Sequence, residues 1–239
     1  MKHVIYTFLQ YIFFRNGVQR TIDGENFRFP IEFARFYPSN SEPLKTNFIL
    51  DHARGNALDL GAHIGLFTVL LARKCELVIA VEPIEATRTA LARTLTMNEC
   101  NNVVVVNQCV SDFNGKGVIF DTGSRGSNAN SIAPIGVPLE KEMRTIDSFD
   151  MDFDFIKIDI EGAEVRALRG AKRTLANVHY MTIEIHPKLI KLIGDNVEEV
   201  FELLDQYRPT YFHEGIKKTP SDLMLMDTQY ELNIILNKN

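Results

Sequence analysis

A short loop with two glycines, Gly61-Ala62-His63-Ile64-Gly65, is the feature that most constrains the fold of this chain. The apolar run Ala57–Leu60 precedes it and predicts a buried strand, and apolar residues at helical spacing follow it. In doubly wound α/β folds, ligands bind outside the carboxyl ends of the strands, where such loops lie. Because glycine lacks a β-carbon, Gly61 and Gly65 let the backbone approach a ligand closely. The loop therefore predicts a nucleoside site in an α/β fold.

A carboxylate at the end of the next strand supports this interpretation. Glu82 directly follows the apolar run Leu77–Val81, and there it can accept hydrogen bonds from both hydroxyls of a ribose. A dinucleotide loop has the pattern G-x-G-x-x-G, which brings a pyrophosphate to the helix N-terminus. His63 stands where the second glycine would be, so the pattern disfavours NAD and favours S-adenosylmethionine, which carries no phosphate. We expect Asp59 near the amino group of that cofactor, directly or through a water molecule.

The rest of the chain predicts a parallel sheet with helices on both faces, because short apolar runs alternate with helical patterns. We expect residues 1–50 to form a helical and irregular extension, and residues 51–239 to form the cofactor-binding domain. Turn residues at Asn114-Gly115 and at 121–130 predict a small antiparallel excursion and a mobile loop. The further expected strands are Val103–Val106, which we expect to be fully buried, Phe155–Ile158, Tyr180–Ile185, Pro209–Phe212 and Leu232–Leu236, the last two as a terminal hairpin; the further helices are Thr87–Met97, Ala163–Leu175 and Val197–Tyr207.

A second dense group of polar residues follows the expected strand at 155–158. Lys157 and Asp159 alternate with isoleucines, so strand pleating places both on one face, and Asp159 falls near the carboxyl end. A charged group in a central strand is costly unless it is paired, which favours a functional role for Asp159. Glu161 and Glu164 open the next helix, where negative charge is favoured, so capping alone also explains Glu164. Asp159 and Glu161 could hold a divalent metal if the strand continues to Glu161 and points both side chains alike, but no metal site is predicted here.

Composition narrows the function classes and the compartment. The formal net charge of −5 disfavours a surface that follows nucleic-acid backbones. The three cysteines lack metal-binding spacing, so we expect free thiols and a cytoplasmic location. No apolar run is long enough for a transmembrane helix. Apolar residues in Met1–Phe14 repeat at helical spacing, which predicts a helix that packs on the domain or contacts a second copy or a membrane surface.

Six segments, in this order, resemble the FkbM-type methyltransferases. They are LDLGAHIGLFTVLLA, VIAVEP, VNQCVSDFNG, RTIDSF, DFIKIDIEGAEVRALRGA and TIEIHP, and they cover most of residues 55–187. The resemblance implies a class I methyltransferase (Rossmann-like) fold, with a seven-stranded, mostly parallel sheet whose last strand is antiparallel. It also implies transfer of a methyl group from S-adenosylmethionine, most often to a hydroxyl of a sugar or a natural product.

The resemblance also assigns residues to roles. It places Asp59, Gly61 and Gly65 in the first cofactor motif, Glu82 at the ribose, and Ser111 and Asp112 on the adenine side. Lys157, Asp159, Glu161 and Glu164 match the motif after the fourth strand. Family members commonly carry Asn where this chain has His63. Because both side chains can donate and accept hydrogen bonds, we expect cofactor binding to persist, with a pH dependence added by the imidazole.

Methyl transfer to a hydroxyl needs alignment of the reactants and a base that takes the proton. The candidates for that chemistry are Asp159 and His186, expected at the ends of adjacent strands, with Lys157 beside Asp159. A purely structural role, with the imidazole bonded to a neighbouring backbone group, also explains a histidine at the end of a strand. Two alternatives from other classes stay open. One is an RNA or protein methyltransferase on the same fold, which the acidic composition disfavours. The other is a module that binds the cofactor without catalysis, which would give no product with any acceptor.

Overall fold

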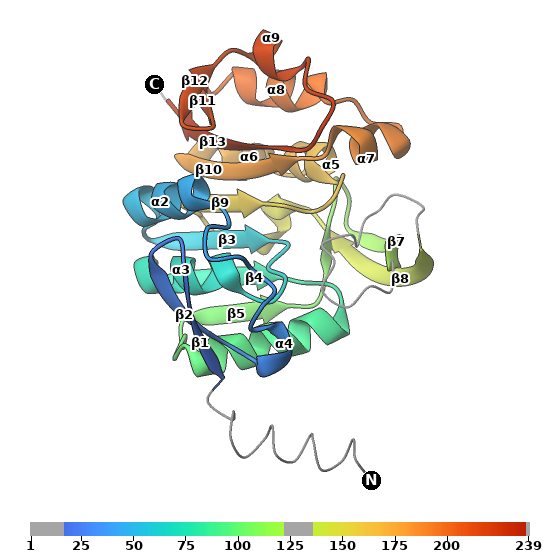
Figure 1. The fold of residues 1–239 in the computed structure, drawn as a ribbon. Coiled ribbons are helices and arrows are strands. Elements are labelled where there is room, and N and C mark those ends of the chain that lie inside the picture. The colour runs from blue at the N-terminus through green and yellow to red at the C-terminus, as the bar shows by residue number, and fades with distance from the viewer. Residues whose placement is uncertain (1–16, 122–135, 238–239) are drawn as a thin grey trace.

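The computed structural model describes residues 17–121 and 136–237 (Figure 1). An eight-stranded sheet lies at its centre, in the order β12-β11-β13-β10-β9-β3-β4-β5. The expected helix at Met1–Phe14 lies outside the described residues. The strands of this sheet are β3 (Asn56–Leu60), β4 (Leu77–Val81), β5 (Val103–Val106), β9 (Phe155–Ile158), β10 (Tyr180–Ile185), β11 (Pro209–His213), β12 (Ile216–Lys218) and β13 (Tyr230–Leu236).

The strand directions confirm the expected fold class. Strands β3, β4, β5, β9 and β10 pair in parallel, and the last strand, β13, is antiparallel to both β10 and β11. The seven expected strands are all present, and the short edge strand β12 adds an eighth. From β3 the chain runs outward to β5 and then returns to β9 on the other side of β3. The strand order therefore reverses between β3 and β9, which is where doubly wound folds bind ligands.

Helices cover both faces of the sheet (Figure 1). Alternate strand residues face opposite cores: Leu58 and Leu60 pack into one, whereas Ala57 packs into the other. The face with Ala57 is covered by α2 (Pro43–His52), α3 (Leu66–Lys74) and α4 (Glu85–Met97), and the face with Leu58 by α5 (Glu164–Arg169), α6 (Lys172–Asn177), α7 (Pro187–Leu192), α8 (Glu198–Asp205) and α9 (Pro220–Leu223).

Two details differ from the sequence-based prediction. Strand β5 is at the edge of the sheet, so it is not fully buried, and Val104 is 49% exposed. The helix expected over Ala163–Leu175 is split into α5 and α6 at Gly170. A β-carbon at Gly170 would lie 2.5 Å from the carbonyl oxygen of Ser111, so the loop that packs there requires glycine at the break.

The described part of the N-terminal extension begins with a β-hairpin that the sequence interpretation missed. Strands β1 (Val18–Ile22) and β2 (Glu25–Phe29) flank Asp23-Gly24, both with positive φ. Asp-Gly between two strands is a strong hairpin signal, and it was available in the sequence. The hairpin buries Phe27 and Phe29 in the core shared with α3 and α4. A 3-10 helix (Ile31–Phe33) and α2 follow, and α2 runs across residue 50 without a break.

A three-stranded sheet projects beyond the carboxyl ends of the main strands. It contains β6 (Cys109–Val110), β7 (Gly115–Asp121) and β8 (Val137–Arg144), followed by a 3-10 helix (Ile146–Phe149). The antiparallel pair β7–β8 is the expected excursion. The loop expected to be mobile falls almost wholly outside the described residues. The three cysteines are free, as expected. Among the described helices, none has the length and apolar character to cross a bilayer.

Candidate functional site

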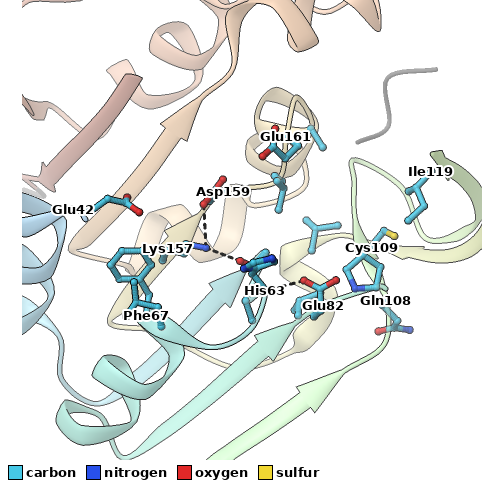
Figure 2. Close-up of a pocket in the computed structure, with 18 of the residues that line it drawn as sticks. Glu42, His63, Phe67, Glu82, Gln108, Cys109, Ile119, Lys157, Asp159 and Glu161 are labelled. Atoms are coloured by element: carbon cyan, nitrogen blue, oxygen red, sulfur yellow. Dashed lines mark hydrogen bonds and ion pairs between the residues drawn. The ribbon is translucent and has the colours of Figure 1, made fainter. Parts of the chain in front are cut away.

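A cavity opens at the carboxyl ends of β3, β4 and β9, where the strand order reverses (Figure 2). It encloses about 930 Å³ of empty space, counting the part open to solvent. Its wall combines the glycine loop, the end of β4, the segment before β7, the loop after β9 and two residues of the N-terminal segment. The lining residues used below are Tyr37, Glu42, Gly61, His63, Glu82, Gln108, Cys109, Val110, Lys157, Asp159 and Glu161.

The glycine loop is shaped by contact with the loop after β9. Gly61 has a φ of +77°, and a β-carbon there would lie 1.8 Å from the carbonyl oxygen of Asp159. Gly65 precedes α3 with a φ of +98°, and its β-carbon would lie 2.8 Å from Leu91. The sequence interpretation assigned both glycines to close approach by a ligand. The structure gives a different reason, since protein atoms already occupy the space beside them, and Gly61 alone of the two lines the cavity.

Glu82 ends β4 and is held by two backbone amides. The N–H of His63 donates to Oε2 at 3.0 Å, and the N–H of Ile84 donates to Oε1 at 2.9 Å. Burial raises the pKa of Glu82 to about 7, although these amides and the charges of Lys157 and Arg88 lower it. Each carboxylate oxygen has a second acceptor position. The two amides hold the carboxylate in the cavity wall, and each of its oxygens can still accept one more hydrogen bond.

Lys157 connects β3 with the loop after β9. Its Nζ lies 3.6 Å from Asp159 Oδ2 (Figure 2). It also lies 2.7 Å from the Gly61 carbonyl oxygen and 3.4 Å from Asp59 Oδ1. Burial alone would lower the pKa of Lys157, but the two carboxylates raise it. The ammonium group therefore stays charged and donates its hydrogen bonds to the glycine loop. In this geometry Lys157 can hold the glycine loop in position. Because its Nζ stays protonated, it cannot accept a proton from a substrate.

Asp59 and Asp159 occupy different positions although the sequence pattern treats both as site carboxylates. Asp59 is fully buried behind the cavity wall, where it accepts a hydrogen bond of 2.6 Å from the Thr68 hydroxyl. Asp159 directly follows β9 and lines the cavity. Burial raises the pKa of Asp159, but the charges of Lys157 and Lys45 outweigh that effect and lower it. Asp159 is thus an anion in the cavity, and Asp59 is the buried counter-ion of Lys157.

His63 lines the cavity in a left-handed backbone conformation, with φ of +50°. Its Nδ1 lies 3.1 Å from the hydroxyl of Tyr37, which comes from the N-terminal segment. Burial and the charge of Lys157 lower the pKa of His63 to about 4, whereas Asp159 opposes the shift. The imidazole is therefore neutral at physiological pH. Any pH dependence that arises from protonation of His63 therefore falls well below neutral pH.

His186 is buried beside three glutamates. Its Nδ1 lies 2.9 Å from Glu164 Oε1, and its Nε2 lies 3.4 Å from Glu161 Oε2 and 3.9 Å from Glu184 Oε1. Burial alone would lower the pKa of His186, but the hydrogen bond and charge of Glu164 and the charges of Glu161 and Asp159 raise it to about 9. Burial also raises the pKa of Glu161 to about 8. Glu161 lines the cavity, whereas His186 supports it from behind.

Two expected adenine-side residues lie away from the cavity. The Ser111 hydroxyl lies 3.2 Å from Asp112 Oδ1, and Asp112 Oδ2 lies 3.6 Å from Arg169, which directs this pair toward α5. The residues just before them, Gln108, Cys109 and Val110, line the cavity instead. The structure therefore places β6 and the residue before it at the cavity, and not the expected pair Ser111 and Asp112.

The sequence interpretation also missed the N-terminal contribution to the wall. Tyr37 and Glu42 line the cavity, and the nearby Lys45 is 1% exposed. Lys45 forms ion pairs with Glu42, with Glu231 at 3.2 Å and with Glu184 at 3.4 Å. These contacts join the N-terminal segment to β10 and β13. No motif marks Tyr37 or Glu42, so tertiary packing was needed to find them.

Comparisons with known proteins agree with this geometry. The family model described as "Methyltransferase FkbM domain" matches residues 59–211, which is more than half of the chain. A comparison with curated proteins gives no match.

The solved structures that are similar to this chain include a methyltransferase and an rRNA methylase. The methyltransferase FkbM from Methylobacillus flagellatus KT is 21% identical, with a TM-score of 0.49, over 75% of this chain and 43% of that protein. This chain therefore spans less than half the length of that protein. An rRNA methylase from Streptococcus thermophilus is 12% identical, with a TM-score of 0.52, over 82% of this chain and 95% of that protein. At such low identity the second likeness shows the fold alone.

Proposed function

The chain belongs to the FkbM methyltransferase family, and from this premise we propose that it transfers the methyl group of S-adenosylmethionine to a hydroxyl oxygen of a sugar or small natural product. The observation that carries the proposal is the position of Glu82. Its carboxylate is fixed at the end of β4 by two backbone amides, beside the glycine loop and inside the cavity. A ribose needs acceptors in that place, and the open acceptor positions of this carboxylate supply them.

Residues 51–239 hold the cofactor-binding domain in this proposal, with residues 1–50 as an extension from which Tyr37 and Glu42 line one side of the cavity. Gly61, His63 and Gly65 form the loop beneath the cofactor, and Gln108 to Val110 face its base in place of Ser111 and Asp112. Asp59 acts indirectly, because it is buried and holds Lys157. Lys157 in turn fixes the carbonyl of Gly61.

In the transfer, the acceptor oxygen forms a bond to the methyl carbon while the carbon–sulfur bond breaks. The products are a methyl ether, the demethylated cofactor and one proton. Asp159 faces the cavity as an anion and can accept the hydrogen bond of the acceptor hydroxyl, which orients its lone pair. His186 is less suited to take the proton, because its Nδ1 is occupied by Glu164 and it does not line the cavity.

The chemistry of the cavity wall favours a neutral, hydroxyl-rich acceptor over nucleic acid. Asp159 lines the cavity as an anion, because nearby lysines lower its pKa, and a negative charge there repels the phosphates of RNA. The formal net charge of −5 acts in the same direction. The alternative is an RNA or protein acceptor, and no specific feature of the cavity favours it.

Calorimetric titration tests the cofactor part of this proposal. We expect S-adenosylmethionine and its demethylated product to bind with one site per chain, and NAD to bind much more weakly. A preference for NAD would contradict the proposal. A panel of sugars and hydroxylated natural products, followed by detection of the demethylated cofactor, tests the transfer itself. Cofactor binding without product from any acceptor would instead support a non-catalytic cofactor-binding module.

A further inference from the structure

We propose that Asp159, Glu161 and His186 form a binding site for one divalent metal ion on the acceptor side of the cavity. One ligand atom from each residue lies within 4.8 Å of the others. Two ligands on opposite sides of an ion lie about 4 to 5 Å apart, which is twice the metal–oxygen distance. The three atoms can therefore contact one ion with little movement of the side chains.

The turn after β9 creates this arrangement. Strand pleating would have directed Asp159 and Glu161 to the same side only if β9 had continued, but β9 ends at Ile158. Glu161 instead takes a left-handed conformation with φ of +51°, and its carboxylate lies on the same side of the cavity as that of Asp159 (Figure 2). The expectation of no metal site thus rested on strand geometry, whereas a turn brings the two carboxylates together.

The imidazole of His186 gives a second, independent indication. It is 4% exposed, and its Nδ1 lies 2.9 Å from Oε1 of the fully buried Glu164, which also accepts a hydrogen bond from the N–H of Gly162. This contact orients the ring so that Nε2 faces Glu161 at 3.4 Å and Glu184 at 3.9 Å. Both distances exceed that of a normal N–H···O bond. A buried ring held through one nitrogen by a carboxylate, with the other nitrogen directed at acidic ligands, is the usual arrangement of a metal-binding histidine.

The ligand types indicate the class of ion. Two carboxylates and one imidazole suit Mn²⁺ and related ions that take six ligands, which leaves three positions for water or for oxygens of a substrate. Asp159 and Glu161 line the cavity, so those positions are directed toward it. An acceptor hydroxyl bound there would be more acidic and held in place, a role that rests on the proposed function.

Titration of Mn²⁺ into the full chain without cofactor, followed by electron paramagnetic resonance, tests the site directly. We expect one bound ion per chain, with Mg²⁺ as a competitor. Glu161→Gln should weaken binding by about tenfold or more. The side chain of Glu161 is 15% exposed in the cavity wall, so we expect this variant to keep the fold, which circular dichroism checks. Glu140→Gln, which removes an exposed carboxylate paired with Lys116, should leave binding unchanged.

Glu164→Gln separates a positioning role from a general loss of charge. It keeps an oxygen that can face His186, and we expect about 10- to 100-fold weaker Mn²⁺ binding with the symmetry of the resonance spectrum altered. Absence of Mn²⁺ binding at millimolar concentration, or equal binding by Glu161→Gln and the unchanged protein, would overturn the proposal. The Mn²⁺ titration tests the metal site alone. Calorimetry of cofactor binding without metal tests the proposed function, so failure of one proposal can be distinguished from failure of the other.

Discussion

Cofactor binding should weaken as the pH falls through about 7, because Glu82 then takes up a proton. Burial raises the pKa of this carboxyl to about 7 in the protein without cofactor. A ribose hydroxyl donates to an ionised carboxylate, so protonation removes an acceptor that the cofactor needs. The form of the protein that binds the cofactor, in which Glu82 is ionised, therefore predominates above pH 7 and is lost below it.

The expected size follows from the fraction of ionised Glu82. If only that form binds, the apparent Kd scales with 1 plus ten to the power of pKa minus pH. With a pKa of about 7, this factor rises from about 1.1 at pH 8 to about 11 at pH 6, so binding weakens about tenfold. Groups next to Glu82 do not titrate in this window: burial lowers the pKa of His63 to about 4 and raises that of Cys109 to about 12, and the carboxylates around Lys157 raise its pKa further above neutrality.

The same pKa affects the stability of the protein without cofactor. Because the folded state holds the Glu82 proton more tightly than the unfolded chain does, its contribution to stability is present below pH 4.5 and is lost as the pH rises to about 7. The full loss is about 3 kcal/mol. Bound cofactor should offset part of this loss, so the gain in Tm on adding cofactor should be larger at pH 8 than at pH 6.

Calorimetry with the demethylated cofactor at pH 6, 7 and 8 measures this effect, with Glu82→Gln as the matched variant. The amide in Glu82→Gln does not titrate, so the weaker binding of this variant should be independent of pH, and Glu82→Ala should cost about 1–3 kcal/mol of binding at pH 8. Glu140→Gln, at an exposed position, should keep the tenfold change. Equal affinity of the unchanged protein at pH 6 and pH 8, or the same slope in Glu82→Gln, would refute the assignment of Glu82 to the ribose.

Three other substitutions test separate parts of the site. Gly61→Ala should destabilise the fold by about 3 kcal/mol or more in urea denaturation, because its methyl group would overlap the Asp159 carbonyl, and a change within about 0.5 kcal/mol would contradict that contact. Lys157→Met should lower the free energy of unfolding by about 3–5 kcal/mol by leaving Asp59 buried without its counter-ion, whereas the exposed Lys116→Met should change it by less than about 0.5 kcal/mol. Asp159→Asn should lower turnover more than it weakens cofactor binding by calorimetry, and unchanged turnover with an active acceptor would leave Asp159 with a structural role only.

The half of the cavity that the glycine loop forms was predictable because its sequence signals are local. Gly61, Glu82 and Asp159 each follow directly from the end of a strand, and the parallel arrangement then brings the three together. By the same reasoning, Asp59 was expected near the amino group of the cofactor, directly or through water, and this stays a prediction; in the structure Asp59 is buried and accepts a hydrogen bond from Thr68 in α3. A residue at a strand end can face either the ligand or the neighbouring helix, and spacing alone does not distinguish the two.

Residues that depend on long-range packing were not predictable. His186 was expected to be a base at a strand end, and only the arrangement of α5 against β10 reveals its contact with Glu164. Glu161 was expected to extend a strand or open a helix, and the left-handed turn that directs it into the cavity has no sequence signal apart from the glycine that follows. Tyr37 reaches His63 across 26 positions of the chain, so no local pattern connects them.

The cavity wall is divided between the region that matches the family and segments outside that region. The match to the family covers residues 59–211, which contain the glycine loop, Glu82 and Asp159. Tyr37 and Glu42 lie before that range, and Glu42 is held by Lys45, whose third partner Glu231 lies after it. One wall of the cavity is therefore built by segments outside the shared region and is fixed by a buried lysine that joins both ends of the described chain. Because these segments lie outside the matched range, we expect the wall that they form to differ between family members more than the wall formed by the glycine loop does.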